Sequence, residues 1–527
     1  MKVRIRKKAD RERERAATSG ERDAATPDEH GAAAKRKGEP KRGVTRGASH
    51  ASRGEAGREP GGKTAAAGKP RGKPRDAGAR AEAAQVSPAR RVAFEVLRRV
   101  EEESAFASVL LAHVTAELRA DDRALCYELT LGVLRRLLWL DKLIEHYAGS
   151  SVASLDAAVA RSLRLGLYQL RFLSRVPASA AVNESVNLTH SANLRPAAGL
   201  VNAVLRRATR EPDFDPAARA GNEIERISVA HSHPAWLVER WAAAFGAGEA
   251  GALASANNRT PPAAFRVNPL RARHAEVIER LRAAGVEAEP SRVAEGAWRV
   301  AAGRGGEVLR ALAHEGVVYT QDEASQLVGR VLGAREGERV LDVCAAPGSK
   351  ATQVAALTRD RAEVVAGDLY DHRLRVVAES AVRQGIGSIR VVALDAEGAA
   401  LPFAEESFDR ALVDAPCTGT GTLRHNPEIR WRLAPADIAE LAARQSRILA
   451  NAARVVRRGG RLVYSTCSVE PEENESVVAA FLKSHKDFRQ ARADVPEGLL
   501  TTSGAARTWP HRDDTDGFYV AVLERES

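Results

Sequence analysis

The stretch "RVLDVCAAPGSK", Arg339–Lys350, decides the fold of the larger part of this chain. A short apolar run is followed by small residues, a proline, a glycine and a lysine. Such continuous runs are typical of strands that are buried on both faces of a parallel sheet. The small residues after the run let the backbone approach a ligand closely. The stretch therefore predicts a strand, a ligand-binding loop and the start of a helix.

The chain after about residue 313 repeats this alternation of apolar runs and helical stretches. Helical segments such as "DHRLRVVAESAVRQG" separate four further runs, which are "AEVVAGD", "IRVVALD", "FDRALVD" and "GRLVYST". Strands that alternate with helices predict a doubly wound, Rossmann-like α/β domain over residues 313–527. In such a sheet, ligands bind beyond the carboxyl ends of the strands.

Three acidic residues stand at three successive strand ends of this predicted sheet. They are Asp342, Asp368 and Asp395, and Asp368 follows Asp342 at the distance usual for an acid that binds ribose hydroxyls. Helix capping explains any one of them, but three together favour a nucleoside-type ligand. A dinucleotide is disfavoured because the loop lacks the G-x-G-x-x-G pattern, and a P-loop is absent too.

Two of the four cysteines lie in small, polar loops that follow apolar runs. Cys417 is in "DAPCTGTG" and Cys467 is in "VYSTCSVEPEEN". A cysteine at the mouth of a strand is placed to react, whereas a structural cysteine is usually buried. Asp414 precedes Cys417, so all three side chains are expected at one sheet edge. Cys126 lies inside a helical apolar pattern and is expected in a core, and no Cys/His spacing predicts a metal site.

The first 85 residues carry the whole charge imbalance of the chain. They hold 23 Lys and Arg against 12 Asp and Glu, which equals the net charge of +11 for all 527 residues. They contain no Leu, Phe, Trp, Tyr or Cys, so the composition predicts a disordered basic tail. Such a tail supplies non-specific contact with nucleic acid, or it is a solvated segment without a partner. Both interpretations stay open.

The remaining chain divides into two further parts. Residues 86–212 have helical spacing throughout and predict an all-α domain. Residues 227–312 mix helical stretches with a short strand pattern, which predicts a small α+β subdomain with possible RNA contacts. Four scattered cysteines favour a reducing, cytoplasmic setting, and neither a membrane span nor a secretory segment is expected.

Two regions resemble known families. "LRLGLYQLRFLSRVPASAAVNESVNLTH" and "GLVNAVLRR" resemble the NusB-like domain, which implies binding of RNA or a partner. "DVCAAPGSK", "QDEASQLV", "DAPCTGTGTLRHNPEIRW", "YSTCSVEPEENE" and "WPHRDDTDGFYVAVL" resemble the RNA cytosine-5 methyltransferases. Together they resemble the 16S ribosomal RNA enzymes of the RsmB type, which use S-adenosylmethionine. Ser349 stands where that family has a second glycine, and serine is small enough for the loop to keep its shape.

The resemblance also implies roles for single residues. It implies that Cys467 attacks carbon 6 of a cytosine and that Cys417 helps to resolve the adduct. The reaction also needs an acid at N3 of the cytosine, and Asp414 fits that role. The residues that it assigns to the cofactor site are Cys344, Ala345, Ala346, Pro347, Gly348, Ser349, Lys350, Asp368, Asp395 and Asp414. The implied partner is 16S ribosomal RNA, with no DNA and no membrane, and a monomer is expected.

Several alternatives remain open at this point. The residues alone leave undecided which cysteine attacks, since DNA cytosine-5 methyltransferases use a proline–cysteine motif like that of Cys417. Lys350 either orients substrate or tunes a thiolate, or it is a capping or surface residue. Three residues beyond the cysteine loop either contact RNA or pack internally, namely His425, Arg430 and Trp431. The rival functions are an inactive RNA-binding assembly factor and a DNA cytosine-5 methyltransferase.

Overall fold

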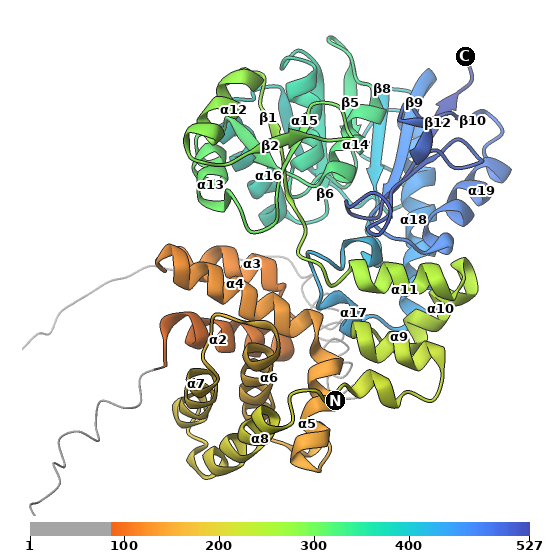
Figure 1. The fold of residues 1–527 in the computed structure, drawn as a ribbon. Helices are drawn as coiled ribbons and strands as arrows, with labels where there is room; N and C mark the ends of the chain where they lie inside the picture. The colour runs from red at the N-terminus through yellow and green to blue at the C-terminus, as the bar shows by residue number, and fades with distance from the viewer. Residues whose placement is uncertain (1–85) are drawn as a thin grey trace, which may run out of the picture. The chain divides into compact units, whose positions relative to one another are not determined.

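The computed structural model describes residues 86–527 (Figure 1). The predicted basic tail lies outside the described residues. The first described part is all helical and packs around one apolar core. Cys126 is fully buried in that core, as its place in the apolar pattern predicted. The helices are α2 (Pro88–Glu102), α3 (Ala107–Val114), α4 (Ala120–Arg135), α5 (Leu137–Ala148), α6 (Ala157–Phe172), α7 (Ala178–Ser191) and α8 (Ala198–Arg210).

Three more helices and a small sheet follow. The helices α9 (Glu223–His231), α10 (Ala235–Phe245) and α11 (Ala247–Ala256) pack around the fully buried Trp241. The sheet has the order β2-β3-β1-β4, with antiparallel pairing throughout. Its strands are β1 (Ala263–Val267), β2 (Ala288–Pro290), β3 (Ala297–Val300) and β4 (Val318–Thr320). The helices α12 (His274–Ala283) and α13 (Gly306–His314) complete this α+β subdomain.

The large sheet has the strand order β10-β12-β9-β8-β5-β6-β7. The five strands from β9 to β7 are parallel, and each corresponds to an apolar run in the sequence. They are β5 (Arg339–Asp342), β6 (Glu363–Asp368), β7 (Ile389–Ala393), β8 (Phe408–Asp414) and β9 (Val456–Thr466). The strand order reverses between β5 and β8, so this is where a doubly wound sheet binds its ligand.

The sheet is mixed, whereas the apolar runs alone predicted a parallel sheet. β12 (Tyr519–Arg525) pairs antiparallel with β9, and β10 (Phe488–Ala491) and β11 (Ala506–Arg507) pair antiparallel with β12. The reason is that burial on both faces makes any strand continuously apolar, whatever its direction. The three-part fold class, with its Rossmann-like C-terminal domain, is confirmed.

Helices cover both faces of the large sheet. On one face lie α14 (Glu323–Leu332), α15 (Ser349–Leu357) and α16 (Asp371–Gln384), and on the other lie α18 (Pro435–Val455) and α19 (Glu475–Ser484). Each face therefore has its own apolar core, which fixes the strand ends rigidly. No helix within residues 86–527 is both long and apolar enough to cross a membrane.

The segment after the first cysteine loop packs against the helical domain through α17 (Ile429–Arg432). Glu428 accepts a hydrogen bond from the Ala107 N–H at 2.7 Å, and Trp431 Nε1 donates to the Leu134 carbonyl at 3.3 Å. Arg430 is fully buried and donates to carbonyl groups that include that of Ser232. The packing interpretation therefore holds for Arg430, because a fully buried side chain presents nothing to RNA.

Candidate active site

The two loop cysteines meet at the carboxyl edge of the large sheet. Cys417 follows β8 and Cys467 follows β9, which are neighbouring parallel strands. Their sulfur atoms are 3.3 Å apart. The sequence placed both cysteines at the same edge, and the structure adds that they touch. Two thiols in contact can share one proton, and both can act on the same bound group at different steps of a reaction.

A buried ion pair lies beside the cysteines. Lys350 Nζ is 2.7 Å from Asp414 Oδ2, and it also donates to Ser325 Oγ at 3.0 Å. Ser465 Oγ donates to Asp414 Oδ1 at 2.8 Å. Burial acts to lower the pKa of Lys350, but Asp414 and then Cys467 raise it, and the net shift is upward. Lys350 is therefore a charged ammonium group inside the site, which excludes the surface interpretation.

Close backbone contacts hold the Cys417 loop in place. Gly421 N–H donates to the Cys467 carbonyl at 2.9 Å, and Gly517 N–H donates to the Gly421 carbonyl at 2.8 Å. A Cβ atom at Gly421 would lie 2.0 Å from the Gly517 carbonyl oxygen, so only glycine fits there. The glycines of "CTGTG" and "DGFYV" thus let three segments meet at the site.

The two cysteines have neighbours of opposite charge. Cys467 contributes to the raised pKa of the Lys350 ammonium group, so the two groups interact. The pKa of Cys417 is raised well above its usual range by its hydrogen bond with Cys467, by burial, and further by the Glu473 carboxylate. Sequence reasoning missed Glu473, because "EPEEN" read alone resembles a solvated acidic run. Its only signal was its place directly after the cysteine motif.

The loop between β5 and α15 fits a bound cofactor. Gly348 has a φ of +102°, and a Cβ there would press on Val377 at 3.2 Å. Ser349 is the first residue of α15, so the departure from the family pattern leaves the loop intact. Asp342 Oδ1 is buried without a hydrogen-bond partner, which leaves an acceptor for a ligand. Burial, and then Asp414, raise the pKa of Asp342 to about 7.

The remaining predicted cofactor residues are arranged less tightly. Asp368 is buried at the end of β6, and Arg373 lies 3.0 Å from its Oδ2 atom. Asp395 is exposed, and it accepts the Glu397 N–H at 2.9 Å in a turn after β7. Cys344 is half-buried in the loop after β5, and burial raises its pKa strongly, so it is an unreactive thiol. Asp368 and Asp395 thus both lie at the carboxyl edge of the sheet, as the sequence predicted.

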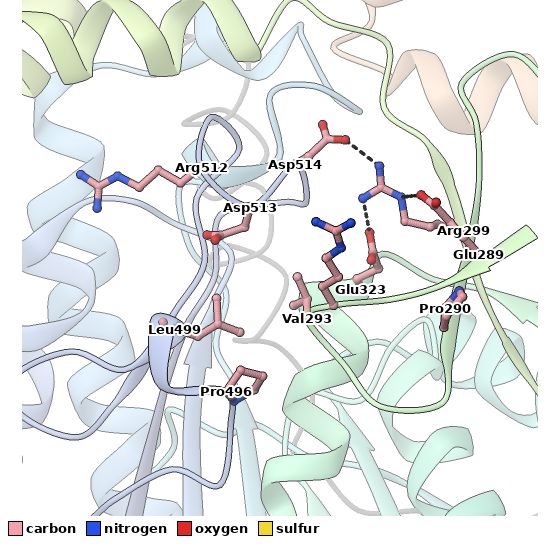
Figure 2. Close-up of a pocket in the computed structure, with 12 residues that line it drawn as sticks. Glu289, Pro290, Val293, Arg299, Glu323, Pro496, Leu499, Arg512, Asp513 and Asp514 are labelled. Carbon is pink, nitrogen blue, oxygen red and sulfur yellow. Dashed lines mark hydrogen bonds and ion pairs between the residues drawn. The ribbon is translucent and has the colours of Figure 1, made fainter.

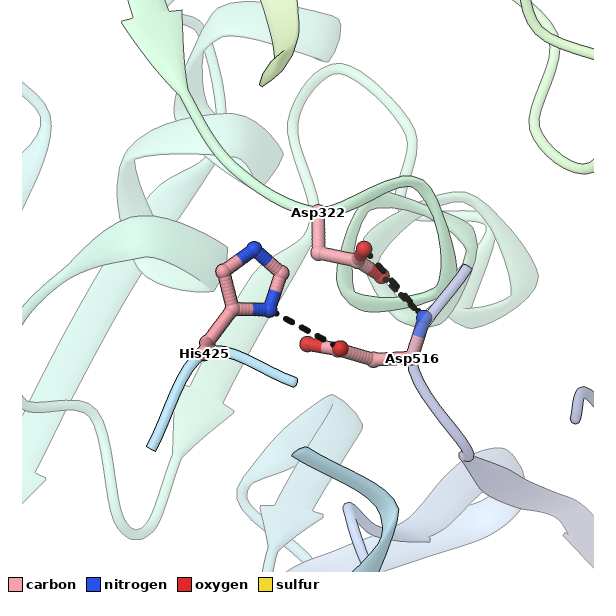
Figure 3. A group of neighbouring side chains, drawn as sticks. All are labelled: Asp322, His425 and Asp516. Atoms are coloured by element: carbon pink, nitrogen blue, oxygen red, sulfur yellow. Dashed lines mark hydrogen bonds and ion pairs between the residues drawn. The ribbon is translucent and has the colours of Figure 1, made fainter. Parts of the chain in front are cut away.

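A second polar cluster consists of Asp322, His425 and Asp516 (Figure 3). His425 Nδ1 is 2.9 Å from Asp516 Oδ1, and the Asp516 N–H donates to Asp322 at 3.3 Å. Burial acts to lower the pKa of His425, but Asp516 and Asp322 raise it, and the net shift is upward. The two carboxyl groups therefore favour the protonated form of His425. The cluster joins the Cys417 segment to the segment before β12, and this supports packing for His425.

A cavity of about 520 Å³ opens beside the α+β subdomain (Figure 2). Arg299 lies in its wall and pairs with Asp514 at 2.7 Å, with Glu289 at 3.1 Å and with Glu323 at 3.7 Å. The charges of the wall thus largely neutralise one another. The lining residues include neither cysteine nor any residue of the loop after β5. This cavity is therefore separate from the candidate active site.

Comparisons with known proteins agree with this architecture. Residues 87–210 match the NusB family, residues 233–305 match the ferredoxin-like domain of RsmF/B-like methyltransferases, and residues 330–524 match the 16S rRNA methyltransferase RsmB/F family. The solved structure of PH0851 is 29% identical, with a TM-score of 0.73, and the match covers 84% of this chain and all of that one.

Two curated relatives match this chain over nearly their whole length. The "Probable ribosomal RNA small subunit methyltransferase B" of Bacillus subtilis is 34% identical over 446 residues, which are 83% of this chain and 98% of the relative. The "Ribosomal RNA small subunit methyltransferase B" of Serratia proteamaculans is 33% identical over 434 residues, which are 82% of this chain and 98% of the relative. S-adenosylmethionine, expected from the loop after β5, is the cofactor of these methyltransferases. The chain belongs to the ribosomal RNA small subunit methyltransferase B (RsmB) family.

Proposed function

We propose that this ribosomal RNA methyltransferase transfers a methyl group to carbon 5 of a cytosine in 16S RNA, through a covalent bond from Cys467 to carbon 6. The observation that carries the proposal is the pair of thiols in contact, with a lysine cation near one and a carboxylate near the other. A single nucleophile needs only one thiol. Two thiols with opposite charged neighbours suit a reaction that must first form a bond and later break it.

The charges favour Cys467 as the attacking group. A thiolate forms more easily beside the Lys350 ammonium group than beside the Glu473 carboxylate. Addition of the Cys467 thiolate to carbon 6 makes carbon 5 electron-rich, provided that N3 is hydrogen-bonded or protonated. We assign this N3 contact to Asp414, which the Lys350 ammonium group holds in place at 2.7 Å. When bound, S-adenosylmethionine supplies the methyl group that carbon 5 takes up.

The resolution of the adduct falls to Cys417. The largest cause of its raised pKa is its hydrogen bond with Cys467. A thioether sulfur carries no negative charge and accepts hydrogen bonds only weakly, so this effect falls once Cys467 is bonded to carbon 6. Cys417 then ionises more easily at the stage at which a base is needed. Removal of the carbon 5 proton then expels the Cys467 thiolate and leaves 5-methylcytosine. The opposite assignment, in which Cys417 attacks, places the attacking thiolate beside an anion and is disfavoured.

The expected substrate is an accessible RNA loop. A target base must leave its stack to reach a thiol at a strand end, and this costs a few kcal/mol, less in a loop than in a duplex. Relatives named for the small ribosomal subunit support 16S RNA as the substrate. A reducing cytoplasmic setting also suits the proposal, because all four cysteines are free.

The test is methylation with labelled S-adenosylmethionine. Purified enzyme is offered 16S RNA and duplex DNA in parallel, and the product base is mapped by digestion and mass spectrometry. We expect 5-methylcytosine in 16S RNA and no label in DNA. Label on another atom, or on DNA, would overturn the proposal. A fully folded enzyme that binds RNA but transfers no methyl group would point to an assembly factor instead.

A further inference from the structure

Glu473 joins the two loops that carry the cysteines. Its carboxylate is fully buried at the end of the short helix η6 (Pro471–Glu473). Oε1 accepts the Thr418 N–H at 2.9 Å and the Gln445 side-chain amide at 2.9 Å. Oε2 accepts the hydroxyl groups of Thr418 and Ser468. Thr418 follows Cys417 directly and Ser468 follows Cys467, so one carboxylate grips the residue next to each thiol.

The backbone that carries Glu473 is itself fixed. The Tyr464 hydroxyl donates to the Glu473 carbonyl. Asn474 Nδ2 donates to the Ser468 carbonyl at 2.9 Å, and the Asn474 amide oxygen accepts the Thr466 hydroxyl. Glu473 therefore has little freedom to follow either loop if the loop moves. A rigid carboxylate with contacts on both sides determines how far apart the loops lie.

No Lys, Arg or His side chain within residues 86–527 bonds to Glu473, since its carboxylate accepts only from Thr418, Gln445 and Ser468. A buried carboxylate is costly unless its oxygens are hydrogen-bonded. Burial raises the pKa of Glu473, and the bonds from Ser468 and Thr418 oppose that shift. Only the ionised carboxylate accepts from all four donors at once, because a protonated one must itself donate.

We infer that Glu473 is a positioning residue that holds the Cys417 and Cys467 thiols in contact, so that adduct formation and adduct resolution occur at one place. The catalytic part of this inference rests on the proposed function. The spacing part does not, because the distance between two thiols can be probed without RNA. Glu473 contacts no reacting atom in the proposed mechanism. It positions the thiols through Thr418 and Ser468, and its charge also raises the pKa of Cys417, a charge that Thr418→Val leaves in place.

The first test measures how readily the thiols join. Diamide oxidises two neighbouring thiols to a disulfide and is itself reduced to the hydrazine, which takes up both protons and both electrons. The Cys417–Cys467 disulfide is followed by mass spectrometry after alkylation of the free thiols. We expect Glu473→Gln to slow its formation at least threefold, because one amide oxygen cannot accept from all four donors. Glu472→Gln is the matched control, since Glu472 contacts Arg240 on the surface, and it should form the disulfide at the wild-type rate.

The second test measures the reaction itself. With RNA and cofactor present, Glu473→Gln should leave at least twice as much enzyme as wild type linked to RNA on a denaturing gel, because Cys417 no longer reaches the adduct well. A variant that is only less stable loses adduct and product together. The melting temperature and the calorimetric affinity for S-adenosylmethionine report whether the variant is folded. Thr418→Val keeps the N–H contact and removes only the hydroxyl, so it decides the question if Glu473→Gln does not fold.

The outcomes separate the inference from the proposed function. Slower disulfide formation with more trapped adduct supports both. An unchanged disulfide rate in a folded variant with wild-type cofactor affinity overturns the inference, whether or not RNA is methylated. Slower disulfide formation in an enzyme whose wild type makes no 5-methylcytosine keeps the spacing role and removes the proposed function.

Discussion

The carboxyl edge of the large sheet has two halves that are built differently. Around β8 and β9, the charged groups have partners among residues 86–527, as Lys350 has in Asp414 and the positioning residue Glu473 has in its four donors. Around β5 and β6, the acidic side chains have fewer hydrogen-bond and ion-pair partners. Asp342 has an oxygen without a partner, and Asp368 is held by the half-exposed Arg373.

The difference indicates which half has acceptors left for a ligand to bind. The half around β8 and β9 keeps its geometry through its own hydrogen bonds. It is therefore preorganised for a reaction in which one thiol must attack before the other helps to release the product. The cofactor half offers acceptors that a nucleoside and an amino-acid group can use. Variants in the first half should therefore change the chemistry, whereas variants in the second half should change the affinity for S-adenosylmethionine.

The largest expected effect comes from the two cysteines. Cys467→Ala should give neither product nor covalent adduct, because it cannot activate carbon 5. Cys417→Ala should still attack and methylate, and then stall with RNA attached through a thioether. The stalled species is a slow band on a denaturing gel that requires both RNA and cofactor. The double variant should lose the band, because attack precedes release.

The reverse pattern would exchange the two roles. A band from Cys467→Ala and none from Cys417→Ala would assign the attack to Cys417, as in DNA cytosine-5 methyltransferases. Full activity of both variants without a band would leave the cysteines structural. Cys126→Ala, in the core of the helical domain, controls for the general loss of a thiol.

The second effect tests the cofactor half. A carboxylate that accepts both ribose hydroxyls makes charge-assisted hydrogen bonds worth about 1.5–3 kcal/mol each. Asp368→Ala should therefore weaken S-adenosylmethionine binding at least tenfold, as measured by calorimetry. Asp395→Ala is the comparison, since Asp395 is exposed and caps a turn, and we expect it to change the affinity less. Equal affinity of wild type and Asp368→Ala would remove Asp368 from the site.

The cofactor half was the easier one to predict from sequence. Its strands are continuous apolar runs that end in acids, and both signals are local. The catalytic half was predicted only in part, because the motif cysteines are visible in sequence but their 3.3 Å contact depends on two loops that are 50 positions apart. Glu473 was missed for the same reason, since its four donors come from three separate segments.

Other differences between expectation and structure have physical causes as well. The antiparallel β12 looks like any other buried strand in sequence, so its direction was not predicted. For Arg430 the sequence left both RNA contact and internal packing open, because isolated arginines usually face solvent. In the structure Arg430 is enclosed by carbonyl groups between domains, and no local sequence pattern predicts such an environment.

A smaller effect concerns the present partner of Asp368. Arg373 occupies the carboxylate that we assign to ribose, and it also donates to the Ala346 carbonyl in the cofactor loop at 3.2 Å. A half-exposed ion pair is worth at most about 1 kcal/mol. If Arg373 must give way, Arg373→Ala should tighten cofactor binding by about two- to fivefold. Weaker binding by calorimetry would mean that Arg373 orders the loop rather than competes for Asp368.

The smallest effect concerns Asp342, which lies between the two halves. Burial, and then Asp414, raise its pKa to about 7 in the folded protein, whereas an unfolded aspartate titrates near 4. The folded protein thus binds the extra proton between these values, and it loses stability as the pH rises from 5 to 8. Asp342→Asn does not titrate, so the melting temperature of the cofactor-free variant relative to wild type should rise by about 2–4 °C from pH 5 to pH 8. Buried acids that do not interact with Asp342 titrate in the same way in both proteins and cancel in the difference. A relative melting temperature that stays constant with pH would show that Asp342 is ionised throughout, and that the Lys350 ammonium group compensates its charge.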